Sequence, residues 1–181
     1  LCGHGTRDGS VCLEFERFVG TIRQKFASSS GQILIEGCYL EFLHPTIEES
    51  FQHLVRANVE RIVAQPLMLF AARHATQDIP NHINRLVTLN PTIAVACGQE
   101  LPLDKSLLAA ARDRIESALI PAGSEERRKT LLLVVGRGSS NAGANQTLSH
   151  LAQELHLGLG IGHFKWAFAG MALPSIEEGL Q

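Results

Sequence analysis

Several features that would indicate other classes of protein are missing from this 181-residue sequence. Its four cysteines (Cys2, Cys12, Cys38 and Cys97) form no CxxC pair, so neither a zinc knuckle nor a compact iron–sulfur motif is indicated. The formal net charge of −2 lacks the basic excess that a nucleic-acid surface needs. The apolar runs are too short to span a bilayer, and no signal-peptide pattern is present. We therefore expect a cytoplasmic globular protein with buried, reduced thiols and without a nucleic-acid or membrane partner. The sequence indicates no oligomeric state.

Two short motifs each occur twice, in the same order. The copies of the first are residues 3–8 (Gly-His-Gly-Thr-Arg-Asp) and 136–141 (Gly-Arg-Gly-Ser-Ser-Asn), and those of the second are residues 45–49 (Pro-Thr-Ile-Glu-Glu) and 174–178 (Pro-Ser-Ile-Glu-Glu). This order indicates a duplication. In the second motif, Thr46 and Ser175 are predicted helix N-caps, each completed by a glutamate three residues later. Only the first copy has an imidazole, because Arg137 stands where the first motif has His4.

Short β-rich runs alternate with amphipathic stretches along the chain. Strands are expected at residues 33–42, 61–70 and 92–96, and helices near residues 11–27, 46–57, 78–86 and 104–119. Strands that alternate with helices need crossover connections, which predict a parallel sheet. Leu1 and Cys2 are expected to end a first strand, and both ends of the chain look cut.

The polar segment 121–129 is the predicted linker between two lobes. Residues 1–120 form the first lobe, and residues 130–181 form a partial second lobe. In the second lobe, a strand at residues 131–135, a helix to about residue 155 and a strand at residues 166–170 are expected. The prediction is an α/β protein of two flavodoxin-like or Rossmann-like parallel-sheet lobes related by duplication, the second one truncated.

Ionisable side chains follow three of the predicted strands. His4 follows the first strand, Glu41 lies near the end of the second, and His74 follows the third. Ligands bind parallel sheets beyond the carboxyl ends of the strands, where these three side chains could converge on one divalent ion. Two nitrogens and one oxygen suit Co²⁺, Ni²⁺ or Fe²⁺ better than Mg²⁺ or Ca²⁺. A carboxylate inside an apolar strand also needs a partner, whereas His4 could belong to a plain tight turn and His74 could cap the next helix.

Together these motifs resemble the class II tetrapyrrole chelatases of the long CbiX type. The resemblance is carried by residues 3–8, 40–42 (Leu-Glu-Phe), 45–47, 66–70 (Pro-Leu-Met-Leu-Phe), 74–75 and 78–80 (Asp-Ile-Pro), and in the second lobe by residues 136–140 and 175–179. It implies a chelatase fold, with a macrocycle held between two lobes. It also implies insertion of Co²⁺ into sirohydrochlorin on the anaerobic cobalamin route, while close relatives insert Fe²⁺ to make sirohaem. The metal-handling residues of the family fall on His4, His74 and Glu41.

The chemistry of metal insertion suits these side chains. Two pyrrole N–H protons must leave, and the metal must shed its hydration shell. An imidazole with a pKa of about 6.5 can ligate a metal when neutral or accept a proton. We therefore expect His4 and His74 to present the ion and take up protons, with Glu41 as a further ligand or a proton relay. No nucleotide is needed, because metal–nitrogen bonding drives the reaction.

Other residues of the loops are candidates for binding the substrate. Arg7, Arg73 and Arg137 are expected to pair with the carboxylates of sirohydrochlorin, unless they are solvated surface charges. Thr6 is a further candidate within the glycine-containing turn. Because the second lobe has Arg137 in the place of His4 and Ala172 near the place of Glu41, it is expected to be a cleft wall.

Three alternative functions stay open. The same fold could insert Fe²⁺. The resemblance implies a distinction here, because some iron chelatases of this family carry a CxxC-bearing tail, and its absence from this sequence is expected to favour cobalt. A non-catalytic carrier of metal or tetrapyrrole would bind without turnover. A phosphate-binding flavodoxin-like module would use Thr6 and the glycine turn to hold an anion, but the turn lacks the third glycine of the dinucleotide fingerprint, and Glu41 and His74 would be unexplained.

Overall fold

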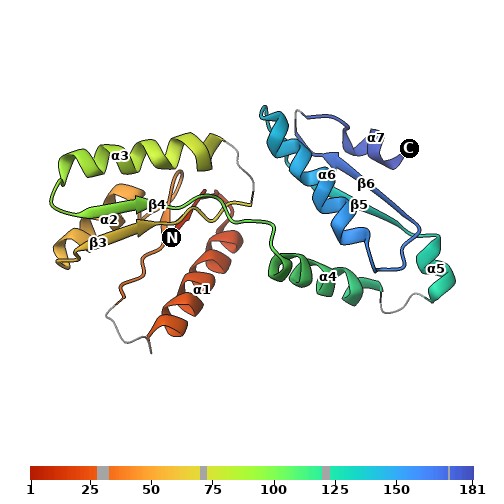
Figure 1. Cartoon of the computed structure of the whole chain (residues 1–181), viewed down its shortest axis with the longest axis horizontal. Coiled ribbons are helices and arrows are strands. Elements are labelled where there is room, and N and C mark those ends of the chain that lie inside the picture. The colour runs from red at the N-terminus through yellow and green to blue at the C-terminus, as the bar shows by residue number, and fades with distance from the viewer. Residues whose placement is uncertain (28–32, 70–72, 120–122, 171) are drawn as a thin grey trace. The chain divides into compact units, whose positions relative to one another are not determined.

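The chain folds into two compact units, Leu1–Leu101 and Pro102–Gln181 (Figure 1). The computed structural model describes residues 1–27, 33–69, 73–119, 123–170 and 172–181, with the side chain of His74 outside the description. Among these residues, no helix is long and apolar enough to cross a membrane.

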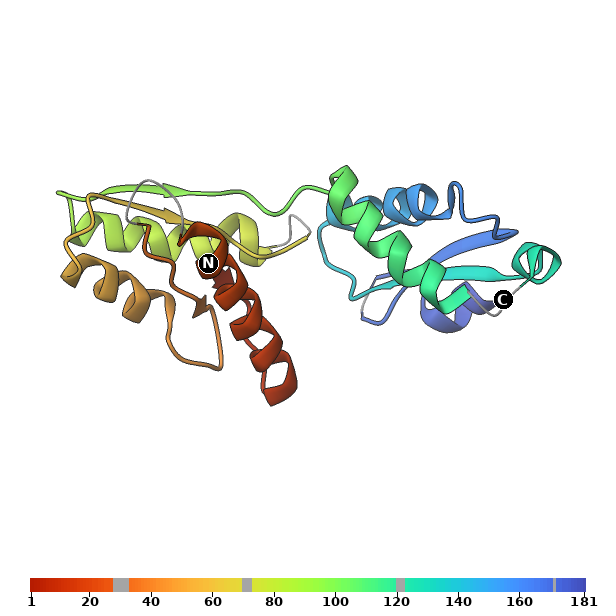
Figure 2. The ribbon, with the colours of Figure 1, turned by 90° about the horizontal axis from the view of Figure 1, so that it is seen from below.

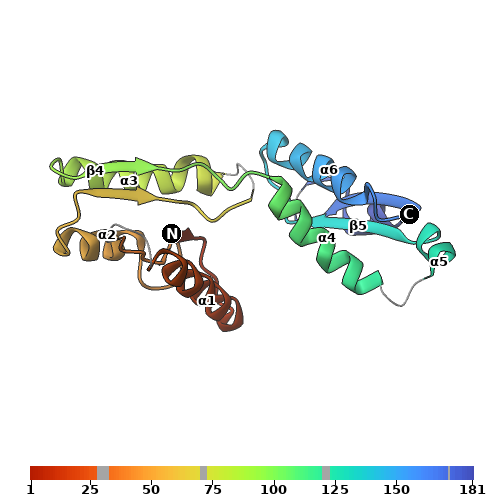
Figure 3. The ribbon, with the colours of Figure 1, turned by 60° about the horizontal axis from the view of Figure 1, so that its bottom comes forward.

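The first unit is built on parallel strands. They are β1 (Cys2–Gly3), β2 (Cys38–Tyr39), β3 (Arg61–Ala64) and β4 (Ala94–Cys97). β1 pairs with β2, β3 pairs with β4, and a parallel bridge between Cys2 and Pro66 joins β1 to the end of β3. The resulting order is β2-β1-β3-β4, and Figure 3 shows β3 beside β4. The predicted parallel α/β fold is therefore confirmed, although only two residues of the predicted strand at 33–42 enter a ladder.

Helices cover both faces of these strands. They are α1 (Gly9–Phe26), α2 (Ile47–Arg56) and α3 (Ile79–Leu89), the last preceded by the π-helical turn η1 (His74–Asp78). Alternate strand residues face opposite ways. Cys2 and Cys38 therefore pack with α2 and α3 in a buried core that includes Phe51 and Ile79. On the other face, the Phe15 ring of α1 lies 4.8 Å from that of Tyr39, and α1 is apart from α2 and α3 in Figure 2.

The second unit pairs two longer parallel strands. It contains α4 (Lys105–Leu119), α5 (Ser124–Arg128), β5 (Leu131–Gly136), α6 (Ala142–His156), β6 (His163–Phe168) and α7 (Ile176–Leu180). The boundary between the units lies between Leu101 and Pro102 instead of at residues 121–129, because α4 packs on α6 and groups with the second unit. The segment predicted as a linker at residues 121–129 carries α5, whose helix start is capped by the Glu126 carboxylate accepting from the Gly123 N–H.

The two sequence repeats adopt the same local structure. The Leu40 N–H donates to the Gly3 carbonyl at 3.0 Å, and the Ala169 N–H donates to the Gly136 carbonyl at 2.9 Å. This equivalence makes Gly170 the counterpart of Glu41 in the second repeat. The expectation that Ala172 lies near that place is corrected, because the offset of 129 residues between Pro45 and Pro174 also holds for Leu40 and Ala169 and takes Glu41 to Gly170.

Both repeats also begin their helices in the same way. Asp8 caps α1 and Asn141 caps α6, and each accepts a backbone N–H through its side chain. The predicted capping boxes are confirmed, since Thr46 pairs with Glu49 at the start of α2 and Ser175 pairs with Glu178 at the start of α7. The repeated residues thus form the scaffold in both units.

The cysteines are free thiols in different surroundings. Cys2 and Cys38 are buried, with their Sγ atoms 3.5 Å apart. Cys12 is half-buried and Cys97 is exposed, so the expectation of buried thiols is wrong for Cys97. It ends β4, whose residues are mostly exposed.

The turn after β1 approaches the turn after β2 so closely that it requires a glycine. Gly5 has a φ of +93°, and a Cβ atom there would collide with the Glu41 carbonyl oxygen. Gly138 has a φ of +84° in the equivalent turn. Positive φ favours glycine because it has no Cβ.

We expect Gly5→Ala to destabilise the first unit. A non-glycine residue in such a conformation costs about 1–3 kcal/mol, and the collision adds to that cost. The midpoint of thermal unfolding, followed by circular dichroism, should fall by at least about 3 °C. Gly9→Ala is the matched control, because nothing lies within 4 Å of a Cβ built there. Equal midpoints for the two variants would contradict the close approach.

Candidate functional site

The predicted metal-handling residues follow the carboxyl ends of three neighbouring strands. β1 lies between β2 and the end of β3, so the connections leaving β1 and β3 border the point at which the strand order reverses. Such switch points are where open α/β sheets bind ligands. His4 directly follows β1, Glu41 comes two residues after β2, and His74 opens η1 on the connection that follows β3.

The structure brings the His4 and Glu41 turns together. The Glu41 N–H donates to the His4 carbonyl at 2.9 Å. His4 is half-buried, its Nδ1 atom lies 2.8 Å from the Gly5 carbonyl, and its ring centroid lies 6.4 Å from that of Phe42. When Nδ1 carries the proton and donates to this carbonyl, Nε2 keeps its lone pair for a metal or a proton. The backbone therefore orients one imidazole in a turn that is hydrogen-bonded to the turn carrying Glu41.

Glu41 is exposed rather than buried in a strand. The strand β2 ends at Tyr39, two residues earlier, so the expectation that Glu41 needs a partner inside an apolar strand is wrong. Leu40 and Glu41 instead line a cavity of about 680 Å³ together with Arg73 and residues of α3. The carboxylate is accessible to a ligand in that cavity.

The ligand set of His4, Glu41 and His74 stays a prediction. The backbone of His74 starts η1, but its side chain lies outside the described part of the structure. Within that part, no three His, Cys, Asp or Glu side chains form a group that could hold a metal.

The candidate substrate arginines have different neighbours. The Arg7 Cζ atom lies 5.1 Å from the centre of the Phe42 ring, a cation–π contact. Arg73 lines the cavity beside Glu41, and its Nε lies 3.4 Å from the Asp78 carboxylate. Arg137 is exposed in the turn after β5, in the second unit. All three roles in substrate binding stay predictions.

Thr6 has a structural role that the sequence did not reveal. Its hydroxyl accepts from the Asp8 N–H at 3.1 Å, and the Ser139 hydroxyl accepts from the Asn141 N–H at the same distance in the second repeat. These turns lead into the capped starts of α1 and α6. Because both repeats share this contact, it belongs to the scaffold, and substrate binding by Thr6 stays a prediction.

Sequence reasoning missed two residues of the cavity. Asn81 and His82 line it together with Asp78. Asn81 and His82 lie three and four positions after Asp78, so the three residues share one face of a helix. This spacing is the sequence signal that could have identified them. His82 also contacts Glu48, with Nδ1 and Oε1 2.6 Å apart. Burial raises the pKa of the Glu48 carboxyl, but the His82 hydrogen bond and the nearby Arg85 charge outweigh it, so the net pKa lies below its usual value.

Known proteins resemble this chain over most of its length. A sirohydrochlorin ferrochelatase from Priestia megaterium is 32% identical over 148 residues, which cover 80% of this chain and 53% of that protein. A sirohydrochlorin cobaltochelatase from the same organism is 26% identical over 181 residues, covering 99% of this chain and 56% of that protein. The chain therefore spans about half the length of these curated relatives.

Solved structures share the fold. SirB from Bacillus subtilis with Fe³⁺ superposes with a TM-score of 0.83 at 25% identity, over 98% of this chain and 67% of that one. SirB from Bacillus subtilis subspecies spizizenii in complex with cobalt gives a TM-score of 0.72 at 22% identity, over 92% and 64% of the two chains. The predicted chelatase fold is confirmed. Since the CbiX family model also matches residues 1–118, the chain belongs to the CbiX family.

Proposed function

We propose that this chain inserts a divalent metal ion into sirohydrochlorin, with cobalt as the preferred metal. The observation that carries the proposal is the joining of the His4 and Glu41 turns through the 2.9 Å hydrogen bond, at the carboxyl edge of the parallel strands. Relatives named sirohydrochlorin cobaltochelatase and ferrochelatase support the choice of macrocycle and of reaction. The proposal extends to this chain an activity named for proteins about twice its length.

The histidines and Glu41 would transfer the metal to the macrocycle and take up the protons that the macrocycle releases. His4 and His74 present the ion to one face of the macrocycle through neutral imidazoles, which replace water in its coordination shell. As metal–nitrogen bonds form, two pyrrole protons leave. The two imidazoles, released from the metal, each accept one of these protons, and the Glu41 carboxylate acts as a further ligand or relays the protons toward solvent.

Substrate binding would use the cations that surround these turns. Arg73 lines the cavity beside Glu41, and Arg7 lies next to the His4 turn. Both are exposed, so their guanidinium groups can pair with carboxylates of a bound macrocycle. Thr6 and Arg137 complete the proposed set.

Iron is the second candidate metal. A ferrochelatase is the relative with 32% identity, and the SirB structure with a TM-score of 0.83 contains Fe³⁺. Imidazole and carboxylate ligands accept Co²⁺, Fe²⁺ and Ni²⁺ alike. The cobaltochelatase aligns with 99% of this chain, which supports cobalt as the first candidate.

The two histidines can be tested by single substitutions. His4→Ala and His74→Ala should each lower the rate of cobalt insertion at least about 100-fold, because each removes a proposed ligand and proton acceptor. The rate is measured from the absorbance change of sirohydrochlorin under anaerobic conditions, with folding checked by circular dichroism. His150→Ala is the matched control, since His150 is exposed on α6. Undiminished activity in either variant removes that histidine from the mechanism.

Metal preference and turnover can be measured together. With sirohydrochlorin in large excess, the unmodified chain should complete many turnovers with Co²⁺ and fewer with Fe²⁺ or Ni²⁺. Product that stops at one equivalent per chain would identify a carrier instead of an enzyme. A faster rate with Fe²⁺ would reverse the choice of metal while leaving the chelatase reaction intact.

A further inference from the structure

His82 belongs both to the contact between α2 and α3 and to the cavity beside Glu41. Its Nδ1 atom lies 2.6 Å from Oε1 of Glu48, on α2. His82 also lines the cavity of about 680 Å³ together with Glu41, and the charged residues Arg73 and Asp78 line the same space. The His82 side chain is 37% exposed. One imidazole therefore reaches a carboxylate, the cavity and solvent.

The Glu48 carboxylate holds this imidazole in one orientation. Arg85, three residues after His82 on α3, donates to the same Oε1 atom at 3.0 Å, so two side chains of α3 keep Glu48 in place. An ionised carboxylate only accepts hydrogen bonds, so Nδ1 carries the shared proton, and Nε2 is the ring nitrogen that can gain or lose one. The carboxylate also stabilises the imidazolium that forms when Nε2 accepts a proton.

Metal insertion needs a proton acceptor beyond the metal ligands themselves. Each turnover releases two pyrrole protons, and an imidazole that has taken up a proton cannot ligate the next ion until it loses that proton. The proposed ligands His4 and His74 must therefore be deprotonated in every cycle. Glu41 and His82 line one cavity, and water within it can pass protons from one side to the other.

We propose that His82 carries the protons released by metal insertion from this cavity to solvent, and that Glu48 positions it. The inference rests on the proposed chelatase activity. Nε2 accepts a proton from the cavity, and the ring becomes an imidazolium paired with Glu48. The exposed ring then gives the proton to bulk water, which regenerates the neutral imidazole for the second proton. Only N–H and O–H bonds form and break in these steps.

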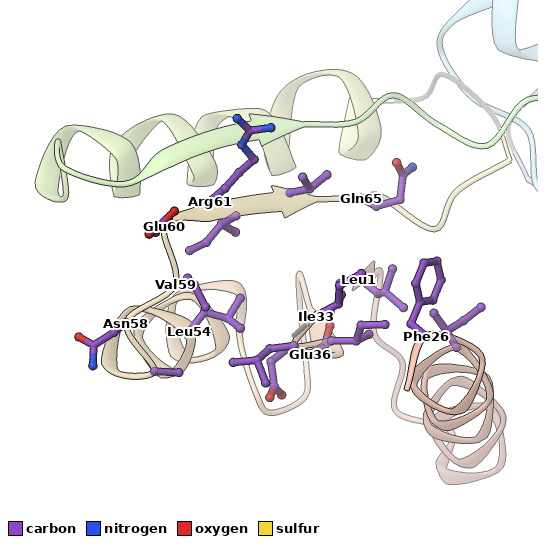
Figure 4. A pocket seen from close by; sticks show the side chains of 16 residues that line it. Leu1, Phe26, Ile33, Glu36, Leu54, Asn58, Val59, Glu60, Arg61 and Gln65 are labelled. Atoms are coloured by element: carbon purple, nitrogen blue, oxygen red, sulfur yellow. Dashed lines mark hydrogen bonds between the residues drawn. The ribbon is translucent and has the colours of Figure 1, made fainter. Parts of the chain in front are cut away.

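A second pair of the same kind provides a matched control. His53, on α2, has its Nδ1 atom 3.1 Å from the Glu36 carboxylate. Glu36 lines a different cavity, of about 700 Å³, at the amino-terminal ends of the strands (Figure 4), whereas His4 and Glu41 follow the carboxyl ends. The His53 pair thus has the same chemistry away from the proposed proton path.

Proton transfer can be tested by chemical rescue in the full chain. In very dilute buffer, His82→Gln should lower kcat for cobalt insertion about tenfold or more, because it removes the proton carrier, and KM for sirohydrochlorin should not change. Added 2,6-dimethylpyridine, a base whose methyl groups hinder metal binding, should restore about half or more of the lost rate. His53→Gln should keep the unmodified rate with and without the base. Circular dichroism checks the folding of each variant.

A double variant tests the positioning role. Glu48→Gln should lower kcat, and it should add no further loss to His82→Gln, because Glu48 acts through His82. A further loss would overturn that role.

Two results would overturn proton transfer by His82. One is a full rate of His82→Gln in dilute buffer, and the other is a loss that the base does not restore. A rise in KM alone would also overturn it and would identify His82 as a substrate-binding residue. An unmodified chain that inserts no cobalt would overturn the proposed function together with this inference, whereas each of the other results leaves the proposed function intact.

Discussion

The candidate site depends on one close contact between two turns. Gly5 lies directly against the Glu41 carbonyl, and the Glu41 N–H returns a hydrogen bond to His4. A side chain at Gly5 would separate the turns. The backbone positions from which the imidazole and the carboxylate extend are therefore fixed relative to each other. Every role considered for this edge of the sheet requires that geometry.

The duplication separates this geometry from the chemistry. The second repeat keeps the positive φ at Gly138 and the capped start of α6. At the positions that would carry chemistry it has Arg137 for His4 and Gly170 for Glu41. Neither a guanidinium, which cannot be deprotonated in a protein, nor a glycine, which has no side chain, can ligate a divalent metal. The comparison of two copies within one chain thus identifies the residues that the fold itself does not require.

Local signals predicted the parts of the fold that are locally determined. The capping boxes at Thr46 and Ser175 and the turns at Gly5 and Gly138 depend on neighbours within a few residues. The extent of β2 was overestimated, because a ladder requires a partner strand and only Cys38 and Tyr39 pair with β1. The placement of α4 and the exposure of Glu41 were missed for the same reason, since packing across the chain decides both. His82 lines the cavity because of where α3 packs, and this packing was not predicted from the sequence.

The arginines near the cavity already have partners before any substrate arrives. Arg73 lies against Asp78, and Arg7 lies over the Phe42 ring. A ligand carboxylate that binds either cation would exchange one favourable contact for another, so a single carboxylate would gain little. A ligand with several carboxylates would make such exchanges together, without a separate loss of translational freedom for each. Prior pairing of the arginines would therefore favour ligands with several carboxylates. A small monocarboxylate would bind weakly, and a polycarboxylated ring would bind more tightly.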